Sequence, residues 1–254
     1  MTNKSEEFTF QSYSYLINEF LNLGYSVVNF SAMNPLKQHL ILRHDIDMSL
    51  EAALPIAEIE RNIGVKATYF ILLRSDLYNP FSETGLKILK RLYDLGHEIG
   101  LHFDASLYSE NISVMNNKAN IECELLERIL ERKINVISFH RPSPRLLNIE
   151  GPLSGRIHTY QPKFFKNIGY CSDSRGGWYY GHPLKHSSVL SLKAIQLLTH
   201  PIWWSRNIGL DPIEVLDDFR EKKDKLIAKT ISSNCDPYRN SRGEKPDSLR
   251  EKNR

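Results

Sequence analysis

Four short apolar runs in this sequence each end in histidine or aspartate. They are Leu42 before Arg43 to Asp47, Leu101 before His102, Phe139 before His140, and Leu198 before Thr199 and His200. A short apolar run that stops at charged groups is typical of a buried parallel strand reaching the rim of its sheet. Because the carboxyl ends of parallel strands meet at one face, we expect these side chains to converge on one pocket.

Carboxylates and imidazoles in one pocket can hold a divalent metal ion. A catalytic zinc site keeps three protein ligands and leaves one position open. Asp47, His102 and one further residue would satisfy that pattern, with manganese, cobalt or nickel as substitutes for zinc. Taken alone, each residue is more often a cap, an ion-pair partner or a packing residue, so the prediction depends on their joint placement.

The elements that must position these residues alternate between helix and strand. Strands are expected over 39–42, 65–73, 98–104, 136–139 and 194–198. Helices are expected over 8–23, 50–62, from Ser82 to Gly96, over 121–129 after a polar loop at 111–120, and from Asp211. This alternation predicts an α/β fold, specifically an irregular (β/α) barrel of about seven strands, with long loops and short strands over 143–186.

Composition favours one large domain. The chain has 254 residues, of which 41% are hydrophobic and 25% charged, enough for a substantial core. We expect the barrel domain to cover residues 1–230 and a disordered polar tail to cover 231–254, where large apolar residues are few. The net charge of +3, from 33 basic and 30 acidic residues, indicates no nucleic-acid partner.

Localisation is predicted from the same sequence. No apolar run approaches the roughly 20 residues of a membrane-spanning helix. The start MTNKSEEFTF lacks the basic and apolar stretches of a secretory signal, which favours a cytoplasmic enzyme. The sequence does not indicate an oligomeric state.

The motifs and their order resemble the NodB-homology polysaccharide deacetylases, carbohydrate esterase family four. The similar segments are Asp45-Ile46-Asp47, 65–70 (VKATYF), 96–102 (GHEIGLH), Phe139-His140-Arg141-Pro142 and 197–200 (LLTH). The resemblance spans about residues 41 to 200. It implies a metal-dependent barrel enzyme that removes the acetyl group from an N-acetylated sugar.

The resemblance also implies a role for individual residues. Asp47 and His102 would be metal ligands. The catalytic set would be Asp45 as general base, Arg141 as the residue that orients it, His200 as the group that protonates the leaving amine, and Asp173 as the carboxylate that tunes His200. Asp173 has an alternative role as a loop cap.

Two positions depart from the family pattern. Ser106 stands where the family has a second histidine ligand. The replacement is expected to be His140 first, Asp104 second, and an additional water third. Pro144 stands where the family has a backbone N–H that stabilises the oxyanion, and proline has none.

The substrate is expected to be an N-acetylated sugar or saccharide intermediate of surface-glycan assembly. Trp178, Trp203 and Trp204 are candidates to stack on sugar rings. Four other histidines are expected to be structural: His97, His158, His182 and His186.

Three alternative functions stay open. In the first, Asp45 and Asp47 form the Asp-x-Asp pair of a glycosyltransferase, although the sequence has no Gly-rich phosphate loop. In the second, the chain is a non-catalytic carbohydrate-binding relative, which Ser106 and Pro144 motivate. In the third, it is an amidohydrolase acting on a cyclic amide or imide.

Overall fold

A parallel β-sheet forms the centre of the first of two compact units, residues 1–209 and 210–254. The structure, a computed structural model, describes residues 8–109, 111–204 and 210–243. The strands are β1 Ser26–Val27, β2 His39–Ile46, β3 Thr68–Leu72, β4 Glu98–Asp104, β5 Val136–His140, β6 Ile157–His158, β7 Gly169–Ser172 and β8 Ile195–Thr199. Their order in the sheet is β6-β5-β4-β3-β2-β8-β7, and β1 pairs with β2 beside this path.

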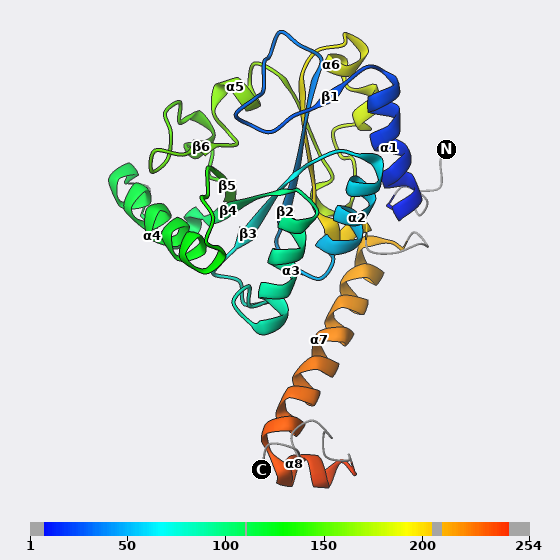
Figure 1. The fold of residues 1–254 in the computed structure, drawn as a ribbon, viewed down its shortest axis with the longest axis vertical. Helices are drawn as coiled ribbons and strands as arrows, with labels where there is room; N and C mark the ends of the chain where they lie inside the picture. Colours follow the sequence, from blue (N-terminus) through cyan, green and yellow to red (C-terminus); the bar gives the residue numbers. More distant parts are fainter. Residues whose placement is uncertain (1–7, 110, 205–209, 244–254) are drawn as a thin grey trace. The chain divides into compact units, whose positions relative to one another are not determined.

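Helices surround these strands, as Figure 1 shows for α1 to α4. The α-helices of this unit are α1 Phe10–Asn22, α2 Ala53–Ile63, α3 Glu83–Asp94, α4 Ile112–Leu130, α5 Pro162–Phe165 and α6 Ser187–Leu190. The 3-10 helices are η2 Ala105–Leu107, η3 Leu146–Asn148, η4 Ser174–Gly176, η5 Pro183–Lys185 and η6 Pro201–Trp204. Residues 40–46 of β2 and all of β3 are buried, as expected for central strands covered on both faces.

The sheet stays open between its end strands β6 and β7, which form no ladder in the described residues. Aromatic side chains lie at this side. The ring of Tyr160, just after β6, lies 6.5 Å from Tyr170 of β7, and both rings contact Phe165 of α5, at 5.1 and 4.9 Å between centroids. The predicted fold class, an irregular α/β barrel of about seven strands, is therefore confirmed as an open barrel.

Helix α4 is longer than predicted. The polar stretch 111–120 was expected to be a loop, but α4 begins at Ile112. The Asn111 side chain accepts hydrogen bonds from the N–H groups of Ser113 and Val114, which satisfies two unpaired donors of the first turn. Met115 and Ala119 extend the buried face of the helix through the polar stretch.

The second unit is helical. Helix α7 covers Pro212–Asn234 and α8 covers Asp236–Ser241. Asp211 and Glu214 form a capping box at the start of α7. Of the predicted polar tail 231–254, residues 231–234 and 236–241 lie in these helices, and 244–254 lie outside the described residues; residues 210–230 group with this unit.

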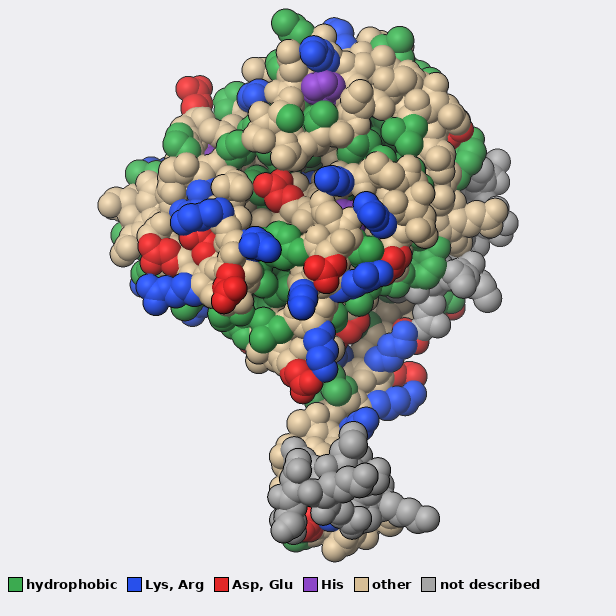
Figure 2. All heavy atoms as spheres, in the orientation of Figure 1, with side chains coloured by type: hydrophobic (Ala, Val, Ile, Leu, Met, Phe, Trp, Pro, Cys, Tyr) green, Lys and Arg blue, Asp and Glu red, His purple; other side chains and the backbone are tan. Residues whose placement is uncertain are grey.

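On the face that Figure 2 shows, acidic and basic side chains of the first unit are interspersed. None of the helices in the described parts of the chain has the length and apolar character needed to cross a membrane.

Candidate active site

One cavity of about 720 Å³ gathers the predicted residues at the carboxyl ends of the strands. Asp45 lies on β2, Asp47 directly after it, His102 on β4, His140 at the end of β5, and His200 directly after β8. All five line the cavity. Residues 155 positions apart in sequence therefore meet because parallel strands end at one face.

Asp47, His102 and His140 form a group suited to a metal ion. His102 Nε2 lies 2.9 Å from Asp47 Oδ1, and His140 Nδ1 lies 3.2 Å from His102 Nε2 and 3.4 Å from Asp47 Oδ1. Tetrahedral zinc with ligand bonds of about 2.0–2.1 Å places neighbouring donor atoms about 3.3 Å apart. The three donor atoms thus fit a divalent metal, with one carboxylate and two imidazoles.

The third member of this group is His140, the first of the alternatives from sequence. Asp104, the second alternative, accepts hydrogen bonds from the backbone N–H and the hydroxyl of Ser106, at 3.1 and 2.5 Å. Its carboxylate caps η2 in this way. Ser106, which stands at the family's ligand position, bonds Asp104 and so belongs to the same turn.

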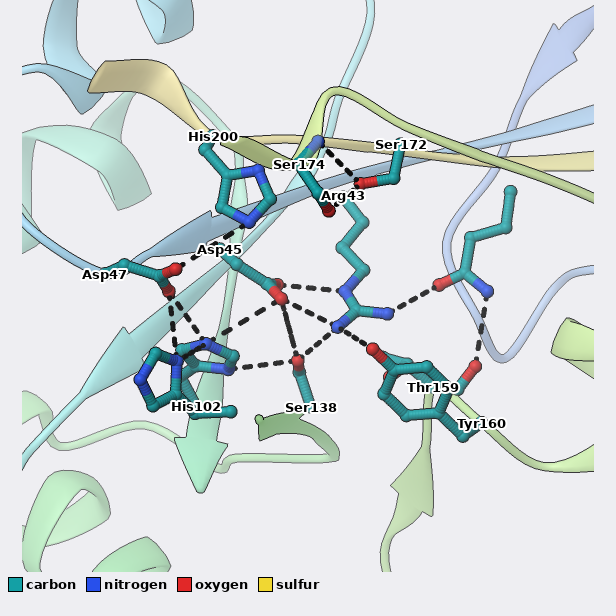
Figure 3. A network of polar contacts seen from close by, with 12 residues as sticks. Arg43, Asp45, Asp47, His102, Ser138, Thr159, Tyr160, Ser172, Ser174 and His200 are labelled. Carbon is teal, nitrogen blue, oxygen red and sulfur yellow. Dashed lines mark hydrogen bonds and ion pairs between the residues drawn. The ribbon is translucent and has the colours of Figure 1, made fainter. Parts of the chain in front are cut away.

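Asp45 is held by Arg43 and not by Arg141. Arg43 Nε donates to Asp45 Oδ1 at 2.9 Å, and Nη2 donates to Oδ2 at 2.7 Å, as Figure 3 shows. Alternate residues of a strand share a face, so Arg43 and Asp45 point to the same side of β2. Arg141 follows β5 with exposed side chain and φ of 50°, and it forms no bond to Asp45. In this structure Arg43 therefore occupies the orienting position that the resemblance assigned to Arg141.

Burial by itself raises the pKa of Asp45, but the adjacent Arg43 guanidinium and then His102 lower it below its usual value. Burial by itself also raises the pKa of Asp47. The hydrogen bonds from His102 and His140 outweigh this effect and hold the pKa of Asp47 well below its usual range. Both carboxylates are therefore ionised at neutral pH.

Ser138 of β5, which the sequence analysis missed, connects the base to the metal group. Its hydroxyl donates to Asp45 Oδ2 at 3.1 Å and accepts from Arg43 Nη2 at 2.5 Å. His102 Nδ1 lies 3.0 Å from the same oxygen. Since an ionised carboxylate only accepts, the single Ser138 proton belongs to Asp45, and His102 Nδ1–H must donate to Ser138. With a metal ion bound, this tautomer would direct the lone pair of His102 Nε2 at the metal.

His200 is oriented by Asp173, as the resemblance implied. His200 Nδ1 lies 2.6 Å from Asp173 Oδ1, and its Nε2 lies 3.8 Å from Asp47 Oδ2. Burial lowers the pKa of His200, but the charge and hydrogen bond of Asp173 outweigh it and raise that pKa to about 9. His200 therefore carries a proton at neutral pH.

The three tryptophans have different positions. Trp203 lines the cavity. Trp204 is buried, donates its indole N–H to Asp173 Oδ2 at 2.7 Å, and is not among the lining residues. Trp178 packs against Phe8 and Trp204, at 5.6 and 6.1 Å between ring centroids, and is not among the lining residues. Only Trp203 keeps the predicted position at the pocket.

A second polar group lies on the opposite face of β2. His44 Nε2 lies 2.8 Å from Glu60 Oε1, and its Nδ1 lies 2.7 Å from the hydroxyl of Thr199. Glu60, from α2, also accepts from the hydroxyls of Tyr13 and Tyr69, both at 2.6 Å. This buried group ties α1 and α2 to the end of β8, just before His200.

Several solved structures of family 4 carbohydrate esterases match this chain at low sequence identity. A family 4 carbohydrate esterase from Bacillus anthracis shares 17% identity, over 82% of this chain and 86% of its own, with a TM-score of 0.44. The chitin deacetylase of Colletotrichum lindemuthianum shares 14% identity, over 78% and 86%, with a TM-score of 0.44.

A third similar structure is a family 4 pseudoenzyme from Bacillus anthracis. It shares 18% identity over 76% of this chain, with a TM-score of 0.37, and this chain spans 63% of its length. A scan of protein-family models and a search of curated proteins give no match.

Proposed function

We propose that this chain is a metal-dependent hydrolase that removes the acetyl group from an N-acetylated sugar. The observation that carries the proposal is the placement of a base and an acid beside one metal-binding group. Asp45 Oδ2 lies 3.7 Å from His102 Nε2, and His200 Nε2 lies 3.8 Å from Asp47 Oδ2. The two proton-transfer groups thus flank the same three donor atoms.

Asp47, His102 and His140 would hold the metal, with zinc as the first candidate. A bound divalent cation supplies Lewis acidity, which polarises a carbonyl and makes water more acidic. Asp45, fixed by Arg43, is placed to accept the proton of the attacking water. His200 is placed to give its Nε2 proton to the nitrogen that leaves. Each such transfer contributes on the order of 10²–10⁴ in rate.

The contacts of Asp45 weigh against the glycosyltransferase alternative. An Asp-x-Asp site presents both carboxylates to the metal. Here both oxygens of Asp45 accept from Arg43, at 2.9 and 2.7 Å, and Asp47 alone joins the histidines.

One of the two residues that motivated the non-catalytic alternative, Ser106, supports it less in the structure. Ser106 leaves the family's ligand position empty, but His140 completes a group of three donors. Pro144, the other motive, lies exposed in the loop after β5. Cytoplasmic location and a place in surface-glycan assembly stay predictions.

The test is acetate release from N-acetylated sugars by the metal-loaded protein. We expect release that Asp45→Asn and His200→Ala each reduce by about 10²–10⁴-fold. Nucleotide release from a sugar nucleotide without acetate would favour the glycosyltransferase. Sugar binding that survives Asp45→Asn, in a protein that holds no metal and releases no acetate, would favour the binding relative.

A further inference from the structure

Arg141 does not bind Asp45, and its positive charge at the cavity has no carboxylate partner among the described residues. It lines the cavity one residue after His140. Its φ of 50° lies in the left-handed region, which non-glycine residues adopt rarely and often at functional sites. Among the described residues, no carboxylate lies within ion-pair distance of Arg141.

Arg175 repeats these properties at β7, an end strand of the sheet. It follows β7, lines the same cavity, is exposed, and has a φ of 62°. Its guanidinium lies 4.5 Å from the ring centroid of Tyr179 and has no carboxylate partner in the described part of the chain. The cavity therefore has two arginines without counter-charges, after β5 and after β7.

The third arginine of the cavity, Arg74, is compensated. It donates to the hydroxyl of Tyr108 at 2.5 Å, and that hydroxyl donates to Glu122 at 2.7 Å. Asp76, two residues from Arg74, also lines the cavity. Arg74 thus has acidic groups nearby and serves as a matched control.

Trp203 supplies a further unused donor. Its side chain lines the cavity, it is 7% exposed, and its indole nitrogen is buried without a hydrogen-bond partner among the described residues. A buried donor without an acceptor is unfavourable. Of the four carboxylates that line the cavity, Asp45, Asp47 and Asp104 are engaged by other groups, which leaves Asp76, two residues from Arg74.

We propose that the cavity binds an N-acetylated sugar carrying a phosphate group, and that Arg141 and Arg175 bind the phosphate. This rests on the proposed deacetylase function and names its substrate class. Guanidinium groups bind phosphate oxygens through paired N–H donors. A phosphate monoester carries a charge of about −1.5 to −2 at neutral pH. This charge balances two unpaired arginines more fully than the single negative charge of a carboxylate group would.

The experiment compares acetate release from N-acetylglucosamine 1-phosphate, N-acetylglucosamine and the carboxylate-bearing N-acetylmuramic acid, using the metal-loaded full chain. We expect the phosphorylated sugar to have the highest kcat/KM. Arg141→Gln and Arg175→Gln should each lower the ratio of kcat/KM for the phosphorylated over the neutral sugar by about tenfold or more. Arg74→Gln should change that ratio by less than about twofold.

Titration calorimetry gives a readout that does not need turnover. We expect N-acetylglucosamine 1-phosphate to bind the metal-loaded protein, with a Kd that Arg141→Gln and Arg175→Gln raise about tenfold. An equal kcat/KM for the neutral and phosphorylated sugars, unaltered in the arginine variants, would overturn the phosphate site and leave the deacetylase standing. Preference for the carboxylate sugar would also overturn it. If no sugar releases acetate, the deacetylase fails, and the calorimetry alone then decides the phosphate site.

Discussion

Arg43 and Asp45 form a bidentate ion pair two residues apart on β2. The side chains are 0% and 4% exposed, and the two bonds measure 2.9 and 2.7 Å. Arg43 Nη1 also donates to Gln196 at 3.2 Å, and its guanidinium lies 4.9 Å from the Tyr160 ring centroid. The orientation of the base is therefore built into the strand that carries it.

Replacing Arg43 should damage both stability and activity. Arg43→Met leaves the Asp45 carboxylate buried without its partner, and we expect a loss of about 3–5 kcal/mol in the free energy of unfolding. Urea denaturation measures this loss. The control is Arg141→Gln, where the side chain is exposed and unpaired, and the change should stay within about 0.5 kcal/mol. Equal effects of the two substitutions would contradict the assignment of Arg43.

Ser138 should control metal affinity through His102. In Ser138→Ala, His102 Nδ1–H loses its acceptor, so the ring is no longer fixed with Nε2 toward Asp47. We expect metal affinity to fall about 10–100-fold, as it does when partners of metal-binding histidines are removed. Competition with a chelator measures the affinity. Ser172→Ala is the matched control, because the buried Ser172 hydroxyl bonds Ser174 and contacts none of the three donor residues; a drop of the same size there would refute a specific role of Ser138.

The third metal ligand can be identified by metal content. His140→Ala removes one of three donor atoms, so we expect the purified variant to retain less than about a tenth of the wild-type metal after dialysis. Asp104→Ala should retain wild-type content, since Asp104 bonds Ser106 instead. Elemental analysis measures both. The reverse pattern would make Asp104 the ligand.

The residues at strand ends were predictable because their signal is local. Asp45, Asp47, His102, His140 and His200 each interrupt or follow an apolar run, and parallel strands bring such positions together. The choice of His140 over Asp104 also followed from its place directly after a strand. Fold class was predictable for the same reason, because helix and strand patterns alternate along the chain.

The partners of these residues were harder to predict. Ser138 lies within the apolar run 136–139, where a serine has many ordinary explanations. Arg43 had a usable signal, since residues i and i+2 of a strand share a face, but a resemblance in motif order assigned its role to Arg141. The different positions of Trp203 and Trp204 depend on the turn of η6, which spacing does not reveal.

Asp173 should be required for the protonation of the leaving group. In Asp173→Asn, His200 loses the carboxylate that bonds its Nδ1 at 2.6 Å and stabilises the protonated ring. We expect kcat for acetate release to fall about 10²–10⁴-fold, with little change in metal content. Trp204→Phe removes one N–H bond to Asp173 and should cost about tenfold or less. Loss of metal in Asp173→Asn would show that Asp173 supports the metal site and not proton transfer.

His158 should make the stability of the fold depend on pH. It is fully buried on β6, and its Nε2 donates to the carbonyl of Gly151 at 2.9 Å while Nδ1 has no partner in the described residues. Burial lowers its pKa from 6.5 to about 4. Between these values the unfolded chain binds the proton and the folded chain does not, so stability falls as pH falls from 6.5 to 4 and this contribution levels off below.

The expected loss from this histidine is on the order of 3 kcal/mol across that interval. His158→Gln keeps a donor for Gly151 but has no titration, so its free energy of unfolding should decline less between pH 6.5 and pH 4 than that of the wild type. Urea denaturation at a series of pH values, using metal-free protein for both, measures the difference. Parallel curves for the two proteins would mean that His158 accepts a proton in the folded state as readily as in the unfolded state.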